Sequence, residues 1–306
     1  MPLHPAHRRH ALALLLTLTV SALSLSACGA PAVRSSHGPL IAIGAEAQYA
    51  NVIAQIGGPF VSVSAVMNNP STDPHSFEVS AALAARVANA SLIVQNGLGY
   101  DSFMNNLESA SPNDHRQVIV ARVVRHLGPS AFDPHLWYDP RTMPLVARAI
   151  AQALSHLRPA HAAYFASQLR RFDHSLVPWT DAVARFRSRS LHITVAVTEP
   201  VADHLLRAMG FTITTPAIFQ SDVMNGIDPA PQAIAIEQQL LARHHVAVFC
   251  YNVQVVDALT DSLRHVAQAA GTPIVGVNEI MPAGENYQTW MVTTTEQLAK
   301  AVTHAT

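Results

Sequence analysis

The chain has 306 residues, a formal net charge of −1, and hydrophobic side chains at 49% of its positions but aromatic ones at only 6%. This length suits one large or two medium domains, and the composition is typical of an alanine-rich globular α/β protein. Because no block of like charge occurs, a nucleic-acid-binding or polybasic membrane-binding role has no basis in the sequence.

The first residues predict a signal peptide. A basic start at residues 7–10 precedes an uncharged apolar run at residues 11–25, which is shorter than the roughly 20 residues of a membrane span. The Leu-Ser-Ala-Cys sequence ending at Cys28 resembles a bacterial lipobox, so we expect this cysteine to be lipidated. Ordinary cleavage beside an incidental cysteine is the alternative. The prediction is a signal peptide with lipobox over residues 1–28 and a flexible tether over 29–38.

After the tether, short β-branched runs alternate with longer helical stretches, a pattern typical of parallel sheets joined by crossover helices. The expected strands of the first half are residues 40–43, 61–66, 92–94 and 118–120. The expected helices are residues 46–56, 80–90 and 142–157. Together they predict an N-terminal α/β lobe over residues 39–158.

The clearest periodic pattern follows this lobe. Seven apolar residues recur at alternating steps of four and three and therefore share one helical stripe. They are Phe165, Leu169, Phe172, Leu176, Trp179, Val183 and Phe186. The pattern predicts a linking helix over residues 159–187, about 40 Å long at the α-helical rise. Pro178 should kink it, and two ordinary helices broken at Pro178 are the alternative.

A second series of strands and helices completes the chain. Its expected strands are residues 192–197, 212–215, 246–250 and 274–277, and its expected helices are 200–209, 231–243, 253–269 and 288–302. They predict a C-terminal lobe over residues 188–306. The predicted fold is therefore α/β, with two similar lobes of largely parallel sheets joined by one long helix. Ligands of open α/β sheets bind at the carboxyl ends of the strands, which points to a cleft between the lobes.

Four polar side chains follow expected strands closely. The tripeptide Asp-Pro-His occurs at residues 73–75 and 133–135, and in each case proline restricts the backbone so that the imidazole is presented in one direction. Two isolated glutamates occupy equivalent places in the second half. The four candidate ligands are His75, His135, Glu199 and Glu279. Two neutral imidazoles and two carboxylates suit a divalent cation, so these residues predict a metal site.

Other polar residues have supporting roles in this prediction. Carboxylates can orient ligand imidazoles from behind, and the candidates are Asp73, Glu78, Asp133 and Asp139. For Asp73 and Asp133, capping of the turn is an alternative. Trp137 and Tyr138 are expected to wall the cleft. His204 could approach the site from the helix after Glu199, and Cys250 is read as a buried, unreactive thiol.

Five segments carry a resemblance to a known family. They are NPSTDPHSFE at 69–78, VQNGLGYD at 94–101, DPHLWYDP at 133–140, EPV at 199–201 ahead of Leu205-Leu206, and GENYQTWM at 284–291. From Leu40 onward the chain resembles the solute-binding proteins of metal-transporting ABC systems, the zinc/manganese-type group whose lobes are joined by a single long helix.

The resemblance implies a fold, a function and a ligand set. His75 and His135 match the two N-lobe histidines of the family, Glu199 stands where members have histidine or glutamate, and Glu279 occupies the place of the last acidic ligand. The implied protein is not an enzyme. It is a monomer that captures zinc or manganese for an ABC permease and its ATPase. It is either anchored to the outer face of the cell membrane by a lipid on Cys28 or periplasmic.

The metal and the function class each leave an alternative open. A carboxylate-rich site favours manganese, whereas the Irving–Williams order favours zinc. The histidine-rich loop common in zinc-dedicated relatives is absent, because residues 107–132 contain only two histidines, His115 and His126. A secreted zinc hydrolase with an open water position is the alternative function, but no HExxH element occurs. Nothing in the sequence directly supports an adhesion or interaction module.

Overall fold

The computed structural model of the chain describes residues 38–69, 80–129, 131–189 and 192–303. The predicted signal peptide, including Cys28, lies outside these residues. The predicted site residues Asp73, His75 and Glu78 lie outside them as well. Within the described ranges, no helix is long and apolar enough to cross a membrane.

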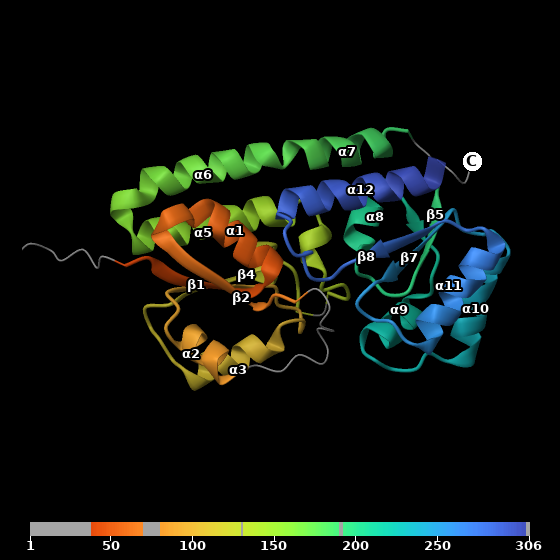
Figure 1. Cartoon of the computed structure of the whole chain (residues 1–306), viewed down its shortest axis with the longest axis horizontal. Coiled ribbons are helices and arrows are strands. Elements are labelled where there is room, and N and C mark those ends of the chain that lie inside the picture. Colours follow the sequence, from red (N-terminus) through yellow and green to blue (C-terminus); the bar gives the residue numbers. More distant parts are fainter. Residues whose placement is uncertain (1–37, 70–79, 130, 190–191, 304–306) are drawn as a thin grey trace, which may run out of the picture. The chain divides into compact units, whose positions relative to one another are not determined.

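The first half of the chain forms a four-stranded parallel sheet (Figure 1). Its strands, in the spatial order β2-β1-β3-β4, are β1 (Leu40–Glu46), β2 (Val61–Met67), β3 (Leu92–Gln95) and β4 (Gln117–Val120). Side chains alternate between the two faces, so that Ala42 and Leu92 belong to one buried cluster and Ile43 and Ile93 to another. Burial on both faces explains the nearly continuous apolar runs of β1 and β3.

Helices cover both faces of this sheet. Helices α1 (Ala47–Gly57) and α5 (Thr142–Leu157) pack on one face, and α2 (Ala81–Ala88) and α3 (Ser102–Ala110) contribute to the cluster on the other. Short helical segments connect the remaining elements: η1 (Gly58–Phe60), α4 (Ala121–Val124), η3 (Leu136–Tyr138) and η4 (Pro159–His161).

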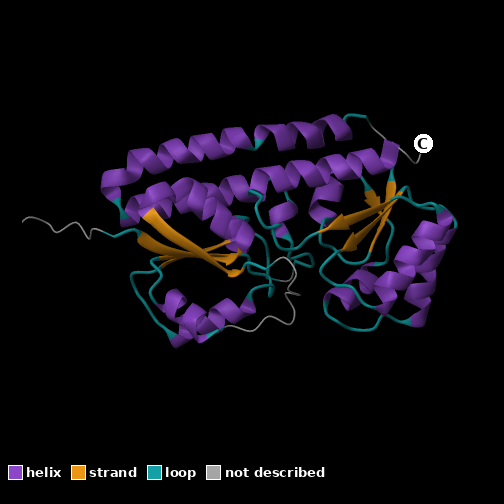
Figure 2. Cartoon of the chain, in the orientation of Figure 1, coloured by secondary structure: helices purple, strands orange, loops and turns teal. Residues whose placement is uncertain are grey.

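The second half repeats the arrangement with a four-stranded parallel sheet of order β6-β5-β7-β8. Its strands are β5 (Thr194–Val197), β6 (Thr212–Ile213), β7 (Val248–Asn252) and β8 (Ile274–Val277). Its helices are α8 (Asp203–Met209), α9 (Ala217–Met224), α10 (Pro231–Ala242), α11 (Ala258–Ala270) and α12 (Tyr287–Thr303). Val195 and Val248 pack in the cluster that includes α8 and α12, whereas Ala196 and Phe249 pack against α9, α10 and α11 (Figure 2).

Two helices placed end to end connect the sheets along the chain. They are α6 (Ala162–Ser175) and α7 (Val177–Arg187), separated only by Leu176. Pro178 lies in the first turn of α7, where its missing N–H costs no helical hydrogen bond. The predicted single helix over 159–187 is thus a short 3-10 turn and two helices. The alternative predicted two helices broken at Pro178, but the break lies at Leu176 and Pro178 is inside α7. Helix α12 packs beside α7 and also contacts α1 (Figure 1).

The predicted α/β class with two parallel sheets is confirmed, and most predicted elements exist within a few residues of their expected bounds. The helix predicted over 253–269 was wrong at its start, because Asp257 accepts a hydrogen bond from the Thr260 backbone N–H at 2.7 Å and caps α11 there. Helices α3 and α9 were not predicted. The sequence of α9 carries little apolar periodicity, and α3 is short, with Met104 as its one fully buried residue.

Candidate metal centre

Three of the four candidate ligands are described, and all three are buried. His135 is 1% exposed and immediately precedes η3, Glu199 is 3% exposed and follows β5, and Glu279 is 0% exposed and follows β8. Each therefore lies just beyond a strand or at the start of a connecting turn, as the sequence analysis expected. His75 lies outside the described residues.

His135 faces Glu279 from the other half of the chain. Its Nε2 lies 3.6 Å from Glu279 Oε2, a distance that suits an ion pair rather than a hydrogen bond. Burial alone would lower the pKa of His135. The carboxylates of Asp133 and Glu279 favour the charged imidazole through hydrogen bonding and charge. Their effect exceeds that of burial and raises the pKa of His135 to about 10. Without a metal ion, the imidazole is therefore protonated at neutral pH.

The backbone around His135 is held from several sides. Asp133 Oδ1 accepts hydrogen bonds from both the backbone N–H and the Nδ1–H of His135, each at 2.9 Å, so this carboxylate caps the turn and also orients the ring. The Asn96 side chain donates to the Pro134 carbonyl at 2.7 Å, and Tyr49 donates to Asn96 at 2.6 Å. These bonds leave Nε2 as the nitrogen available to a ligand.

Asn96 itself depends on a tight turn after β3. Gly97 has a φ of 82°, a left-handed conformation that glycine adopts without a steric penalty. Asp101 closes the turn by accepting hydrogen bonds from the backbone N–H groups of Asn96 and Gly97. The segment VQNGLGYD thereby supports His135 from the first half.

Glu279 is also surrounded by hydrogen-bond donors. Tyr100 donates to Glu279 Oε2 at 2.9 Å. Burial, followed by the charge of Glu279, raises the pKa of Tyr100, so this phenol remains a donor. The Asn252 amide donates to Glu199 Oε1 at 2.9 Å and also to Glu279 Oε1. Gln48 donates to the Glu279 carbonyl at 3.3 Å.

The structure thus connects His135, Glu279 and Glu199, but it does not close them into a cage. The Asn252 amide lies between the two carboxylates. Among the residues that the structure describes, no three His, Cys, Asp or Glu side chains converge closely enough to hold a metal ion. The ligand set from the sequence therefore stays a prediction.

The remaining predicted residues occupy distinct places. Asp139 pairs with Arg125 at 2.9 Å and Arg141 at 2.7 Å, and no contact with an imidazole is seen in the described structure. The Trp137 ring lies edge-on to His135, with centroids 5.4 Å apart. Cys250 is buried in the middle of β7, and burial raises the pKa of its thiol.

The sequence analysis did not single out several residues that the structure places here. Tyr100 and Asn252 contact the candidate carboxylates, and Glu46 ends β1 with both carboxylate oxygens buried and without hydrogen-bond partners in the described structure. Burial, followed by the charge of Asp101, raises the pKa of Glu46 well above its usual value. Glu46 and Asn252 are polar residues at strand ends, which is the signal that identified the candidate ligands, whereas Tyr100 lies in the turn after β3.

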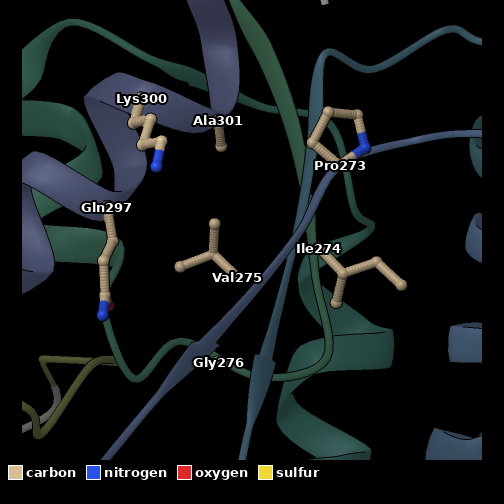
Figure 3. Close-up of a pocket in the computed structure, with 7 residues that line it drawn as sticks. All are labelled: Pro273, Ile274, Val275, Gly276, Gln297, Lys300 and Ala301. Atoms are coloured by element: carbon tan, nitrogen blue, oxygen red, sulfur yellow. The ribbon is translucent and has the colours of Figure 1, made fainter. Parts of the chain in front are cut away.

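The candidate residues do not line the pocket beside β8. This pocket of about 400 Å³ lies between edge strand β8 and helix α12 (Figure 3). Pro273 and the β8 residues line one side, and Gln297, Lys300 and Ala301 of α12 line the other. None of the candidate ligands borders this pocket, so the pocket is separate from the candidate metal centre.

Comparison with known proteins places this architecture among metal-binding transport components. The family model described as "Zinc-uptake complex component A periplasmic" matches residues 45–301. The zinc-binding protein TroA of Treponema pallidum (strain Nichols) is 26% identical over 221 residues, 66% of this chain and 69% of TroA. The manganese-binding lipoprotein MntA of Bacillus subtilis (strain 168) is 24% identical over 160 residues, 50% of this chain and 52% of MntA.

Solved structures share the fold. The solute-binding protein FpvC of Pseudomonas aeruginosa, in complex with Mn²⁺, superposes with a TM-score of 0.71 at 20% identity and covers 88% of this chain and 99% of FpvC. The Mn-bound periplasmic metal-binding protein from Candidatus Liberibacter asiaticus gives a TM-score of 0.68 at 15% identity, over 86% of this chain and 99% of that one. At these identities the likeness establishes the fold.

Proposed function

The chain belongs to the family of periplasmic zinc-uptake complex components, and from that premise we propose that it captures a divalent transition metal ion, zinc or manganese, and delivers it to an ABC permease. The family consists of transport components, so the hydrolase alternative has no support. One observation carries the proposal: the buried His135 Nε2 faces the buried Glu279 carboxylate at 3.6 Å across the two halves of the chain.

The proposed ligands are His75, His135, Glu199 and Glu279. Around the buried carboxylates, the raised pKa of His135 favours its charged form, and the Asn252 amide donates a hydrogen bond to each glutamate. A divalent cation supplies positive charge instead, so its arrival displaces the proton from Nε2 and the amide from between the glutamates. Metal binding and proton release are therefore coupled.

The arrangement of the chain supports capture between two lobes. We propose that residues 39–158 and 188–306 act as lobes joined by 159–187. Tyr138 donates to the Asn278 carbonyl at 2.9 Å and Gln48 to the Glu279 carbonyl at 3.3 Å, so hydrogen bonds join the two halves. We expect the linking segment, α6 and α7, to limit the opening motion to a small tilt.

Delivery requires a permease and an ATPase in the membrane, and a lipid on Cys28 would keep the receptor beside them. We propose that the mature protein is monomeric and remains outside the cytoplasmic membrane. The motif around Cys28 supports the anchor.

A binding experiment tests the function. The purified mature protein should bind one equivalent of Zn²⁺ or Mn²⁺, and zinc should win a direct competition. His135→Ala and Glu279→Ala should each weaken binding by more than about 100-fold, the upper range for residues behind the ligands. Titration against a chelator measures both effects.

His156→Ala is the matched control, because His156 is exposed on α5. Its affinity should equal that of the unsubstituted protein. Full affinity in both ligand variants, with the circular dichroism spectrum unchanged, would show that the site has been assigned to the wrong residues.

A further inference from the structure

Asp133 lies between two histidines that come from different halves of the chain. Its Oδ1 binds the backbone and ring of His135. On its other side, His204 Nε2 lies 3.3 Å from Oδ2 and 3.4 Å from the Asp133 carbonyl oxygen. Asp133 is only 7% exposed, so these contacts occur largely out of water.

The contact between His204 and Asp133 joins residues that are far apart in the sequence. His204 is the second residue of α8, which follows Glu199 in the second half, whereas Asp133 precedes η3 in the first. The preceding residue, Asp203, is buried and pairs with Arg207 at 2.8 Å. Of these two residues at the start of α8, His204 is the one whose side chain contacts the Asp133 carboxylate.

His204 also lies beside a carboxylate oxygen of Asp133 that has little other compensation. Asp133 Oδ2 is buried and accepts no hydrogen bond within the described part of the chain. A buried carboxylate oxygen without a partner is costly, and the imidazole at ion-pair distance offsets that cost. Because Nε2 is directed at Asp133, His204 is not itself among the ligand candidates.

We propose that His204 is a positioning residue for metal binding, which fixes Asp133 from the second half and through it the ring of His135. This inference rests on the proposed function. A ligand imidazole must hold its ring orientation for the metal to stay bound, and the carboxylate behind it supplies that orientation. Since the His204–Asp133 contact joins the two halves, it must break before they separate and release the ion.

The test compares His204→Leu with His204→Gln. Leucine removes the N–H, whereas the glutamine amide replaces it near the position of Nε2. Zn²⁺ dissociation into excess chelator, followed by stopped flow, should accelerate about tenfold in His204→Leu, the lower range for residues behind metal ligands. His204→Gln should restore most of the original rate. His265→Leu, at an exposed histidine of α11 in the same half, is the matched control and should change nothing.

A double-mutant cycle separates positioning from general stability. In an Asp133→Ala background, His204→Leu should have no further effect on Zn²⁺ dissociation, because its route to His135 is gone. An acceleration that persists in that background would overturn the inference. So would a lower unfolding temperature in His204→Leu with unchanged zinc dissociation, which indicates a purely structural contact.

Metal binding by the unsubstituted protein shows whether the proposed function or only the role of His204 has failed. If that protein binds neither Zn²⁺ nor Mn²⁺, the proposed function fails and the role of His204 fails with it. If it binds metal normally and His204→Leu dissociates at the original rate, only the role of His204 is refuted.

Discussion

Single carboxylates in this protein differ widely in how their charge is compensated. Asp139 has two arginine partners, and although burial opposes the effect, they lower its pKa to about 2. Glu237 accepts a hydrogen bond from the Thr215 hydroxyl at 3.0 Å, and burial raises its pKa to about 8. The first carboxylate stays charged at neutral pH, and the second is largely protonated.

Glu237 predicts a pH dependence of stability. Its pKa is about 8 in the folded protein and near 4.5 in the unfolded chain, so folding takes up a proton between these values. Stability therefore falls as pH rises through this window, by about 1.4 kcal/mol per unit at the steepest. Glu237→Gln keeps a neutral side chain of the same shape and should abolish this loss.

Urea unfolding of the metal-free protein at pH values of about 5, 6.5 and 8 measures the effect. The variant and the unsubstituted protein should have similar free energies of unfolding at the lowest pH, and the variant should be the more stable at the highest. A constant difference at all three pH values would mean that Glu237 is ionised in the folded protein.

At the level of elements, caps and sheet positions decide where helices begin and what they cover. Helix α11 begins at Ala258 rather than at the apolar run before it, because the Asp257 carboxylate binds the Thr260 N–H. Helices α6 and α7 abut at Leu176, with Pro178 in the first turn of α7. In both cases one side chain sets the boundary.

The cap of α11 gives a stability prediction. Asp257→Ala should lower the free energy of unfolding by about 1 kcal/mol, because the first turn of α11 loses the partner of one backbone N–H. Asp261→Ala is the matched control on the same helix. It removes an exposed pair with Arg264, which is worth only about 0.3–0.5 kcal/mol. Chemical denaturation should separate the two variants, and equal losses would argue against the cap.

For the whole molecule, the central property is that the candidate metal centre is assembled from both halves. Each half contributes residues to the proposed ligand set, and each half contacts residues of the other: Tyr100 donates to Glu279, and His204 contacts Asp133. Within Pro39–Thr306, which form one compact unit, metal binding and contact between the halves are therefore expected to be linked.

This linkage predicts metal release on acidification. The pKa of His135 is about 10 without metal, so at any pH below that value a proton competes with the ion for Nε2. Apparent affinity should fall about tenfold for each pH unit of acidification from this group alone. Calorimetry in buffers of different ionisation enthalpy should detect about one proton or more released per metal near neutral pH. Affinity that does not change between pH values of about 5 and 7.5 would contradict histidine ligation.

The sequence by itself determined the local features. Apolar runs in β1 and β3, the seven-residue stripe along α6 and α7, and the Asp-Pro-His turn at residues 133–135 all follow from the chemistry of neighbouring residues. The family resemblance lies in short segments of the same kind, and it implies the four candidate ligands.

Only the tertiary structure decided which polar groups meet. That Tyr100 binds Glu279, that Asn252 lies between two glutamates, and that His204 reaches Asp133 depends on how two sheets pack. The physical reason is that such contacts join residues distant in the chain, which share no periodicity or local motif. Their burial, and hence their pKa values and partners, exists only once both halves have folded together.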